Sequence, residues 1–286
     1  MPTLKETKNR INSVQSTLKI TSAMKLVASA KLRRAQSVIE GMRPYQRQIH
    51  SILGDLLATN GVSLGAWAQE REVKNVRILA FASNSSLCGA FNANVIRLTL
   101  ETARSFGDAQ VQITGIGRKM ADALRKAGFA SGADYMSLAE RPSYREAAAL
   151  AQEVVDDYNA GRCDRVVLVY THFVSAGKQV PVAETLLPFN PSTMGGEGRQ
   201  DGGLHYIIEP TAQKVLEDLV PKALRLAVYT ALLDSNASEH AARTVAMQAA
   251  TDNGEDLLAE LTLQYNKSRQ QKITAEILDL AGGVQE

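Results

Sequence analysis

The sequence predicts an α/β protein in which two long helical segments flank a small domain with a mostly parallel sheet. Helical periodicity runs from about Thr3 to Ala58 and again from about Thr211 to Gly282, and strand and helix patterns alternate between these two segments. At roughly 1.5 Å per residue, continuous helices of this kind would extend roughly 80 and 105 Å. Helices of such length must bury their apolar stripes mainly against each other or against a partner.

The first segment carries a heptad repeat. Alternating steps of three and four residues from Ile11 to Leu56 visit fourteen positions, and eleven of them are apolar. This pattern predicts a left-handed coiled coil, whereas the alternative is an ordinary helix of a bundle. The three polar exceptions are Thr21, Lys25 and Gln46.

The second segment is less regular and is rich in small residues, which allow a partner helix to approach closely. Pro44 predicts a bend in the first segment, and Pro221 predicts a kink or a break near the start of the second. Asn253-Gly254 should weaken the second helix near its middle. The small residues are Ala237, Ala241, Ala242, Ala246, Ala249 and Ala250.

Positive charge is concentrated at the N-terminal end. Residues 1–50 contain ten basic and two acidic residues, a local net charge of +8 in a chain whose total is +2. A helix of this charge attracts an acidic surface, which could be phosphate, a lipid headgroup or a carboxylate-rich protein loop. The alternative is a solvated helix face, although few acidic residues stand at the spacing that would neutralise the charge.

Cysteine content and hydropathy indicate a protein of a reducing compartment. Cys88 and Cys163 are the two cysteines of the chain and cannot form a disulfide framework. We find no apolar run of about 20 residues and no hydrophobic signal core at the N-terminus. We therefore expect an intracellular protein that associates with a membrane only through partners.

Between the long segments the periodicity changes to that of a sheet covered by helices. Pro181 places the last candidate strand at an edge, and the composition of residues 190–203 is typical of a linker. The expected strands are Val76–Ala82, Val111–Ile116, Arg165–Thr171 and Gln179–Leu187, and the expected helices are Gly89–Phe106, Arg118–Gly128 and Tyr144–Gly161. The predicted division is an N-terminal helix at 1–58, a connector at 59–75, the α/β domain at 76–190, a linker at 191–210 and a C-terminal helix at 211–286.

The motifs of catalysis are absent from the sequence, so we expect no catalytic residue, no cofactor and no metal. Gly115-Ile-Gly117 begins like a dinucleotide-binding fingerprint, but Met120 stands where the third glycine belongs, which favours a simple turn. The four histidines lack the spacing of zinc ligands. Ser83, Ser85 and Ser86 lack the context of a nucleophile elbow, and Cys88 is better explained as a small buried residue.

Four separated stretches resemble the gamma-subunit family of the F-type rotary ATP synthase. The resemblance implies the full fold class: α/β, with a long antiparallel coiled coil of the N- and C-terminal helices plus a small Rossmann-like α/β domain. In place of an acidic and basic pair followed by glycine, this chain has Asn84, Ser85 and Ser86, so a charge interaction there is not expected. The four stretches are Ser13–Lys31, Leu87–Asn92, Ala241–Gly254 and Tyr265–Ile277.

The resemblance also implies a mechanical function. A chain of this family is a non-catalytic central-stalk rotor, which couples ion-driven rotation of a membrane ring to conformational changes at the nucleotide sites of the beta subunits. The implied partners are the alpha and beta subunits, the epsilon subunit and the ring of c subunits, at the cytoplasmic face of a bacterial plasma membrane. No nucleic acid is expected as a partner.

Matching positions suggest two sets of contact residues. The expected beta-subunit contacts are Met24, Lys25, Lys31, Arg33, Arg243, Arg269, Gln270 and Thr274. The expected contacts with the rotor ring and the epsilon subunit are Tyr206, Ile207, Ile208 and Glu209.

Two other classes of function remain as alternatives. A nucleotide-binding enzyme with helical arms would need a phosphate-cradling loop. A basic coiled-coil tether for nucleic acid would explain the charge of residues 1–50 and would bind in a strongly salt-dependent way. Neither alternative accounts for the stretch Tyr265–Ile277.

Overall fold

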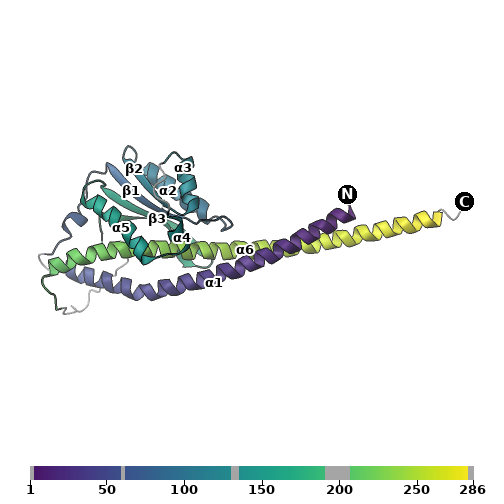
Figure 1. Ribbon diagram of the computed structural model, residues 1–286, viewed down its shortest axis with the longest axis horizontal. Helices are drawn as coiled ribbons and strands as arrows, with labels where there is room; N and C mark the ends of the chain where they lie inside the picture. The colour runs from purple at the N-terminus through teal and green to yellow at the C-terminus, as the bar shows by residue number, and fades with distance from the viewer. Residues whose placement is uncertain (1–2, 59–61, 130–134, 191–206, 283–286) are drawn as a thin grey trace. The chain divides into compact units, whose positions relative to one another are not determined.

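The computed structural model describes residues 3–58, 62–129, 135–190 and 207–282. The chain forms two compact units, one made of residues 1–29 and 243–286 and the other of residues 30–242. Two long helices, α1 (Leu4–Leu57) and α6 (Ala212–Gly282), contribute to both units (Figure 1). Helical N- and C-terminal segments are thus confirmed, while the finer division of the chain into five segments stays a prediction.

Both long helices continue through the residues that the sequence marks as weak points. α1 contains 54 residues and includes Pro44, and α6 contains 71 residues and includes Pro221. A proline removes one backbone hydrogen bond. Around Pro221 the side chains of Val220 and Leu224 are fully buried, and this packing outweighs the lost bond. Hence α6 is not broken at Pro221.

A capping box begins α1. The backbone N–H of Thr3 donates to Glu6 Oε2 at 2.8 Å, and the backbone N–H of Glu6 donates to Thr3 Oγ1 at 3.3 Å. Two of the N–H groups at this helix terminus are therefore satisfied reciprocally. The bond from the Thr3 backbone also holds the pKa of the Glu6 carboxyl below its ordinary value.

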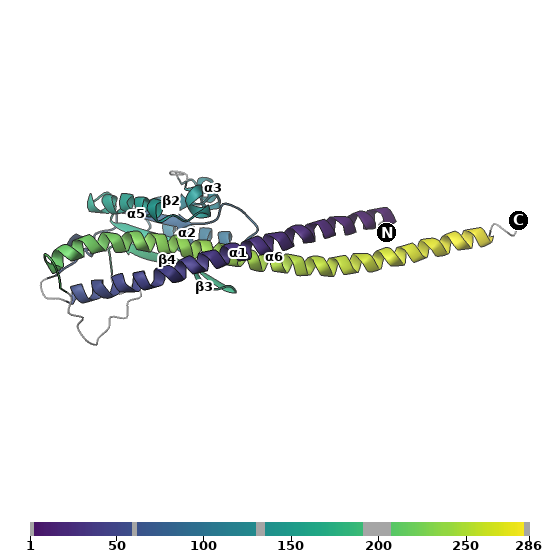
Figure 2. The ribbon, with the colours of Figure 1, turned by 60° about the horizontal axis from the view of Figure 1, so that its bottom comes forward.

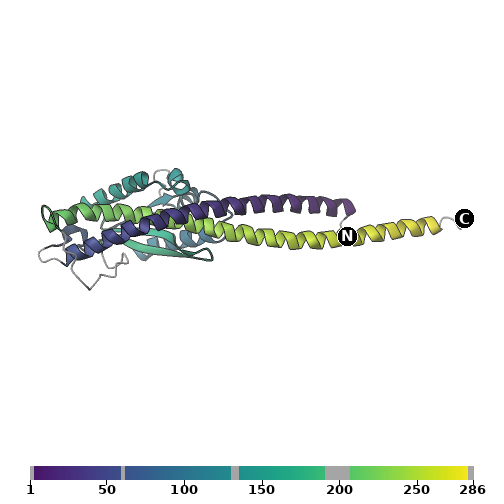
Figure 3. The ribbon, with the colours of Figure 1, turned by 90° about the horizontal axis from the view of Figure 1, so that it is seen from below.

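In the unit formed by residues 1–29 and 243–286, the two helices run antiparallel. Along this pair the residue numbers rise on α1 as they fall on α6, and each facing pair adds to about 272. With that register, Leu4 lies opposite about residue 268, and α6 continues beyond the start of α1 (Figures 2 and 3). The facing pairs are Leu18 with Gly254, Thr21 with Thr251 and Lys25 with Gln248.

Two polar exceptions of the heptad repeat therefore meet polar partners. Thr251 Oγ1 donates to Thr21 Oγ1 at 3.0 Å, and Lys25 Nζ donates to Gln248 Oε1 at 2.8 Å. A polar side chain at a core position of a coiled coil favours the register in which it finds a polar partner. These pairs thus agree with the register that the apolar positions support.

The other unit contains a four-stranded sheet with the order β2-β1-β3-β4. β1 pairs in parallel with β2 and β3, and β3 pairs antiparallel with β4. The four predicted strands are confirmed; β4 lies at one edge, as Pro181 indicated, and β2 lies at the other. The strands are β1 (Asn75–Phe81), β2 (Gln110–Ile116), β3 (Arg165–Ser175) and β4 (Lys178–Leu187).

Five shorter helices accompany the sheet in the described part of the chain. The three predicted helices are confirmed as α2, α3 and α5 (Figure 1). The sequence analysis missed η1 and α4, because three and five residues are too few to reveal a helical period. The helices are η1 (Gly65–Trp67), α2 (Phe91–Ser105), α3 (Arg118–Lys126), α4 (Met136–Glu140) and α5 (Tyr144–Asn159).

Alternation along β1 assigns the two faces of the sheet. Val76, Ile78 and Ala80 belong to a core shared with α2 and α3. Leu79 and Phe81 belong to a second core, shared with α5 and with the parts of α1 and α6 in this unit. Because both faces are covered, nearly every residue of β1 is buried, which is why its sequence is apolar apart from Asn75 and Arg77.

Gly254 allows the close approach of the two helices in the unit of residues 1–29 and 243–286. A Cβ atom at Gly254 would lie 2.6 Å from Leu18 Cδ2 and 3.2 Å from Leu18 Cγ. At Gly41, which also lies inside a long helix, a Cβ would meet nothing within 4 Å. Both glycines therefore lie in a helical backbone, but only Gly254 is packed against a neighbouring side chain.

We expect Gly41→Ala to raise the free energy of unfolding by about 0.5–1 kcal/mol, because alanine favours helix and meets no neighbour. Gly254→Ala should give little or none of this increase in the free energy of unfolding, because the new methyl group would force Leu18 to move. Thermal and urea unfolding followed by circular dichroism would compare the two variants. An equal stabilisation by both would contradict the close packing of Gly254 against Leu18.

Candidate functional site: exposed surfaces of the long helices

The crevice where an open α/β sheet usually binds ligands is filled by the protein itself. Ligands of such sheets bind beyond the carboxyl ends of the strands, often at a helix N-terminus. Here the N–H of Arg118 donates to Asn84 Oδ1 at 3.0 Å, and the N–H of Lys119 donates to the Ser83 carbonyl at 3.0 Å. The first N–H groups of α3 are consequently satisfied without a phosphate.

Gly117 has a structural role at this turn. Its φ is +96°, and a Cβ there would lie 2.2 Å from the Ala82 carbonyl oxygen. At Gly115 a Cβ would lie 3.0 Å from Leu124 Cδ1, so this glycine allows α3 to pack closely on β2. The expected turn is therefore confined to Gly117, the residue before α3, because Gly115 and Ile116 are the last two residues of β2.

Asn84 connects three segments around the same crevice. Besides accepting from the Arg118 N–H, its Nδ2 donates to the Met136 carbonyl at 2.7 Å. The side chain therefore links the end of β1 to the beginnings of α3 and α4. Asn84 is therefore a structural residue, in the segment where the sequence differs from the family that it resembles.

A cavity of about 400 Å³ lies at the opposite, amino end of the strands. Arg77 lines it and is 9% exposed, but its guanidinium is engaged: it pairs with Glu153 at 3.0 Å and with Asp157 at 3.0 Å. Burial raises the pKa of Cys163, which also lines the cavity, to about 11, so this thiol is not a ready nucleophile. Within the described ranges we find no cluster of three or more groups that could hold a metal.

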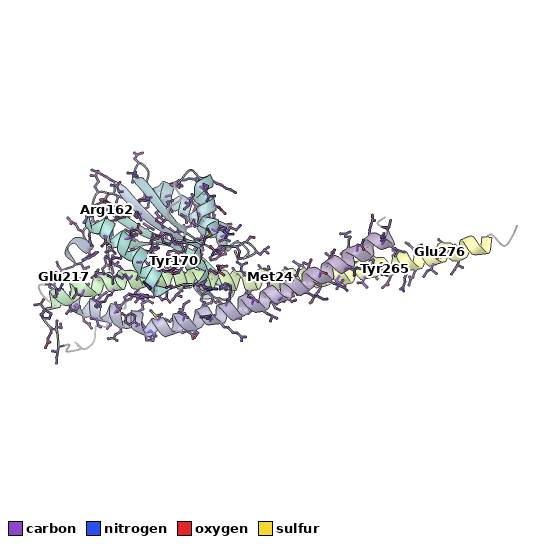
Figure 4. The ribbon with its side chains drawn as sticks, in the orientation of Figure 1. Met24, Arg162, Tyr170, Glu217, Tyr265 and Glu276 are labelled. Atoms are coloured by element: carbon purple, nitrogen blue, oxygen red, sulfur yellow. The ribbon has the colours of Figure 1, made fainter. Side chains whose placement is uncertain are left out.

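The surfaces of α1 offer charge that the chain does not neutralise. None of the lysines and arginines in the described part of α1 forms an ion pair with another residue that the structure describes. Lys25 is half-buried and donates to the neutral Gln248, so its positive charge stays uncompensated. Met24 beside it (Figure 4) is also half-buried. Lys31 and Arg33 are exposed and belong to the other unit.

Large apolar side chains accompany this charge. On α1, Ile20, Leu26 and Val27 are 59%, 68% and 57% exposed. On α6, Val245 and Leu263 are 52% and 71% exposed. Grouped exposed apolar residues beside unpaired charges are typical of a protein interface.

The predicted contacts on α6 fall into two separate places. Arg243 lies about five residues from Gln248, the partner of Lys25; it is 9% exposed and engaged within the protein. Arg269 is exposed, and it lies roughly 30 Å further along the helix than Gln248 at about 1.5 Å per residue. Met24, Lys25 and Arg243 therefore share one region of this unit, and Arg269 belongs to another.

Near the end of α6, Gln270 and Thr274 are exposed like Arg269. Thr274 Oγ1 donates to the Gln270 carbonyl at 2.9 Å, so that its hydroxyl proton is already used within the helix. This leaves the Arg269 guanidinium and the Gln270 amide as the outward donors of the patch. Glu276 lies further along the same helix (Figure 4).

The predicted contacts before α6 are only partly described. Tyr206 lies outside the described residues. Ile207 is 93% exposed, Glu209 is exposed, and Ile208 is half-buried against the core.

Leu87 is a candidate contact that the sequence analysis did not single out. It is 60% exposed and has a φ of +66°, an unusual backbone conformation for a bulky residue. The Asn92 side chain holds the loop around it, because Nδ2 donates to Ser83 Oγ at 2.8 Å and to the Ser85 carbonyl at 3.2 Å. One feature of the sequence points to this residue: Leu87 begins the stretch Leu87–Asn92, which resembles a known family.

No helix in the described ranges is both long and apolar enough to cross a membrane.

Comparison with known proteins identifies related chains. A family model described as ATP synthase matches residues 3–285. The ATP synthase gamma chain of Bacteroides fragilis strain ATCC 25285 is 51% identical over 287 residues, which cover 99% of each chain. That of Pelotomaculum thermopropionicum is 41% identical and covers 99% of this chain and 98% of the relative.

Solved structures share the fold. A chain in the rotor of the Euglena gracilis mitochondrial ATP synthase matches with a TM-score of 0.64 and 20% identity, covering 94% of this chain and 98% of that chain. A chain in the central stalk and c-ring of the Tetrahymena thermophila enzyme matches with a TM-score of 0.60 and 24% identity, covering 81% and 99%. Full-length identity to curated gamma chains and the family model together place this chain in the ATP synthase gamma chain family.

Proposed function

We propose that this chain is the central-stalk rotor subunit of an F-type ATP synthase. In this role it couples ion-driven rotation of a membrane ring to conformational changes at the nucleotide sites of the beta subunits. The observation that carries the proposal is the exposed surface of α1 around Lys25, where unpaired positive charge lies beside large exposed apolar side chains. Neighbouring structures described as rotor and central stalk support it at the level of the fold.

Lys25 is the central group of the proposed beta-subunit contact. Because Gln248 is neutral, the hydrogen bond positions the ammonium without cancelling its charge. A partner carboxylate that reaches Lys25 would gain a charge-assisted hydrogen bond. Met24 and the exposed Leu26 would add apolar contact on either side.

The exposed Arg269 and Gln270 form a second proposed contact. A guanidinium can hold a carboxylate through two parallel hydrogen bonds, and the amide adds a neutral donor. The proposed beta-subunit contacts also include Lys31, Arg33, Arg243 and Thr274. The proposed contacts with the rotor ring and the epsilon subunit are residues 206–209.

Rotation of the stalk would affect the catalytic sites through contacts that differ from one beta-subunit conformation to another. A rotor can change the affinity of a catalytic site only if its surface binds one conformation of the beta subunit more tightly than another. The two contact regions face partners at different levels along α6. The proposed partners are the alpha, beta and epsilon subunits and the c ring, and the chain would lie at the cytoplasmic face of a bacterial plasma membrane through them.

The chain itself is proposed to be non-catalytic. ATP hydrolysis requires a loop that cradles the phosphates, a Mg²⁺ site and a group that orients water. The filled crevice at Asn84 and the engaged Arg77 support this assignment.

The purified chain alone should therefore show no ATPase activity above a buffer control, whereas a complex captured through it should hydrolyse ATP. Subunit composition by mass spectrometry and phosphate release would be measured on both samples. Turnover by the isolated chain, after removal of contaminating ATPases, would refute the non-catalytic role.

Reversing the charge at Lys25 should uncouple the complex more than it unfolds the chain. Lys25→Glu removes an exposed hydrogen bond worth about 0.5–1.5 kcal/mol and places a negative charge against the proposed carboxylate. We expect a lower ratio of ATP made to ions moved in reconstituted vesicles, with normal subunit stoichiometry.

Gln248→Ala is the matched control for this experiment, since it removes the same hydrogen bond and leaves the Lys25 charge. It should reduce the coupling ratio much less than Lys25→Glu. Equal effects of the two variants would show that the hydrogen bond matters and the charge does not.

Leu87→Asn should stabilise the chain and impair the complex. Asparagine tolerates a positive φ, so the free energy of unfolding should rise by about 0.5–1 kcal/mol. If Leu87 contacts a partner, ATP turnover of the reconstituted complex should fall at the same time. Gly89→Ala, in the same loop at a φ of +57°, should instead destabilise the chain. Unchanged turnover with Leu87→Asn would remove Leu87 from the interface.

A further inference from the structure

The ammonium group of Lys25 begins a chain of hydrogen bonds that continues along α6. Lys25 Nζ donates to Gln248 Oε1 at 2.8 Å, and Gln248 Nε2 donates to Asp252 Oδ1 at 2.6 Å. All three residues lie in the unit of residues 1–29 and 243–286. One amide therefore joins a positive group on α1 to a negative group on α6.

The two charged groups decide which way the Gln248 amide faces. An ammonium group can only donate hydrogen bonds, and an ionised carboxylate can only accept them. The amide oxygen must therefore face Lys25, and the amide nitrogen must face Asp252. Hydrogen bonds to ionised groups are short and strong, and each of these two bonds polarises the amide in the sense that strengthens the other.

Asp252 is placed to hold this amide. It stands four residues after Gln248 on α6, a spacing that makes the two side chains neighbours on the helix surface. Asp252 is exposed, and it forms no ion pair with any residue that the structure describes. Its carboxylate is therefore connected to Lys25 through Gln248, without a direct contact that would cancel the charge.

This arrangement restricts a side chain that is flexible by nature. The ammonium of a lysine sits on a four-carbon stem and samples many directions when it is free. Ordering such a side chain on binding costs conformational entropy, and a side chain that is already held loses less of it. A held but uncompensated ammonium is thus well prepared to meet a carboxylate of a partner.

We propose that Asp252 is a positioning residue for Lys25, acting through Gln248, and that it needs no contact of its own with the partner. The inference rests on the proposed rotor function, because it concerns the contact proposed there for Lys25. The alternative is an ordinary surface pair of glutamine and aspartate, which would stabilise α6 and leave Lys25 unaffected.

Nuclear magnetic resonance of the full chain, labelled with ¹⁵N-lysine, tests the positioning directly. The Lys25 ammonium signal would be assigned by its loss in Lys25→Arg, and its proton exchange with water would be measured in mildly acidic buffer. Asp252→Ala should speed this exchange by roughly two- to fivefold, the size expected of an exposed pair. The signal of Lys31, which is exposed on α1, should not change.

Two further variants separate positioning from a general effect of charge. Asp252→Asn keeps an oxygen that can accept from Gln248, so its Lys25 exchange should stay close to that of the unmodified chain. Asp256→Ala is the matched control, because it removes an exposed carboxylate from the same helix one turn further on. It should leave Lys25 exchange unchanged, and circular dichroism would establish that all variants are folded.

The assembled complex tests the consequence for coupling. Asp252→Ala and Gln248→Ala should each lower the ratio of ATP made to ions moved, by less than Lys25→Glu does. The double variant should be no worse than Gln248→Ala alone, since residues that act through one another are not additive. Additive losses would overturn the route through Gln248.

The two measurements also keep this inference apart from the proposed function. Lys25 exchange that is unchanged in Asp252→Ala, or changed equally in Asp256→Ala, would overturn the positioning role and leave the proposed contact of Lys25 intact. Faster exchange in Asp252→Ala, combined with a normal coupling ratio in Lys25→Glu, would instead overturn the proposed contact itself.

Discussion

Two helices of 54 and 71 residues cannot expose their apolar stripes to water, and this constraint organises the protein. Most of the stability of a helix in a protein comes from packing one face, since propensity alone is marginal. In the unit of residues 1–29 and 243–286, the face of α1 is covered by α6 in a single register. In the other unit, the same two helices supply one half of the sheet core. The long helices are thus shared elements that both units need.

The sheet domain is better explained as a scaffold than as a binding fold. Its carboxyl-end crevice is occupied by Asn84, and its amino-end cavity is lined by an arginine with two internal carboxylate partners. Each of these sites could hold a small molecule in a protein with other side chains. The uncompensated charge and the large exposed apolar side chains lie instead on the outer surfaces of the long helices.

Sequence periodicity predicted the elements well, because both cores are built from regular patterns. A mostly apolar strand such as Val76–Ala82 and a sustained heptad repeat from Ile11 can each be recognised from the sequence without tertiary information. The continuity of α6 through Pro221 could not be predicted, since it depends on the burial of Val220 and Leu224 by residues distant in sequence. The close packing at Gly254 could not be predicted either, because it depends on where Leu18 lies in the folded protein.

The candidate site was harder to predict than the fold. The sequence shows the positive charge at Lys25. It does not show that Lys25 bonds to the neutral Gln248, because the two residues are 223 positions apart along the chain. The backbone conformation of Leu87 leaves no trace in composition or spacing. The positions of Met24, Arg243 and Arg269 as partner contacts stay predictions, because the structure contains one chain.

The unequal lengths of α1 and α6 have a thermodynamic consequence. With Leu4 opposite about residue 268, the last four turns or so of α6 have no other described helix beside them, and their Ile273, Ile277 and Leu278 side chains are 47%, 59% and 65% exposed. An isolated helix of about a dozen residues is marginal in water. Any surface that encloses these turns contributes part of their folding free energy, so that folding of this tip and binding of its surroundings become one coupled equilibrium.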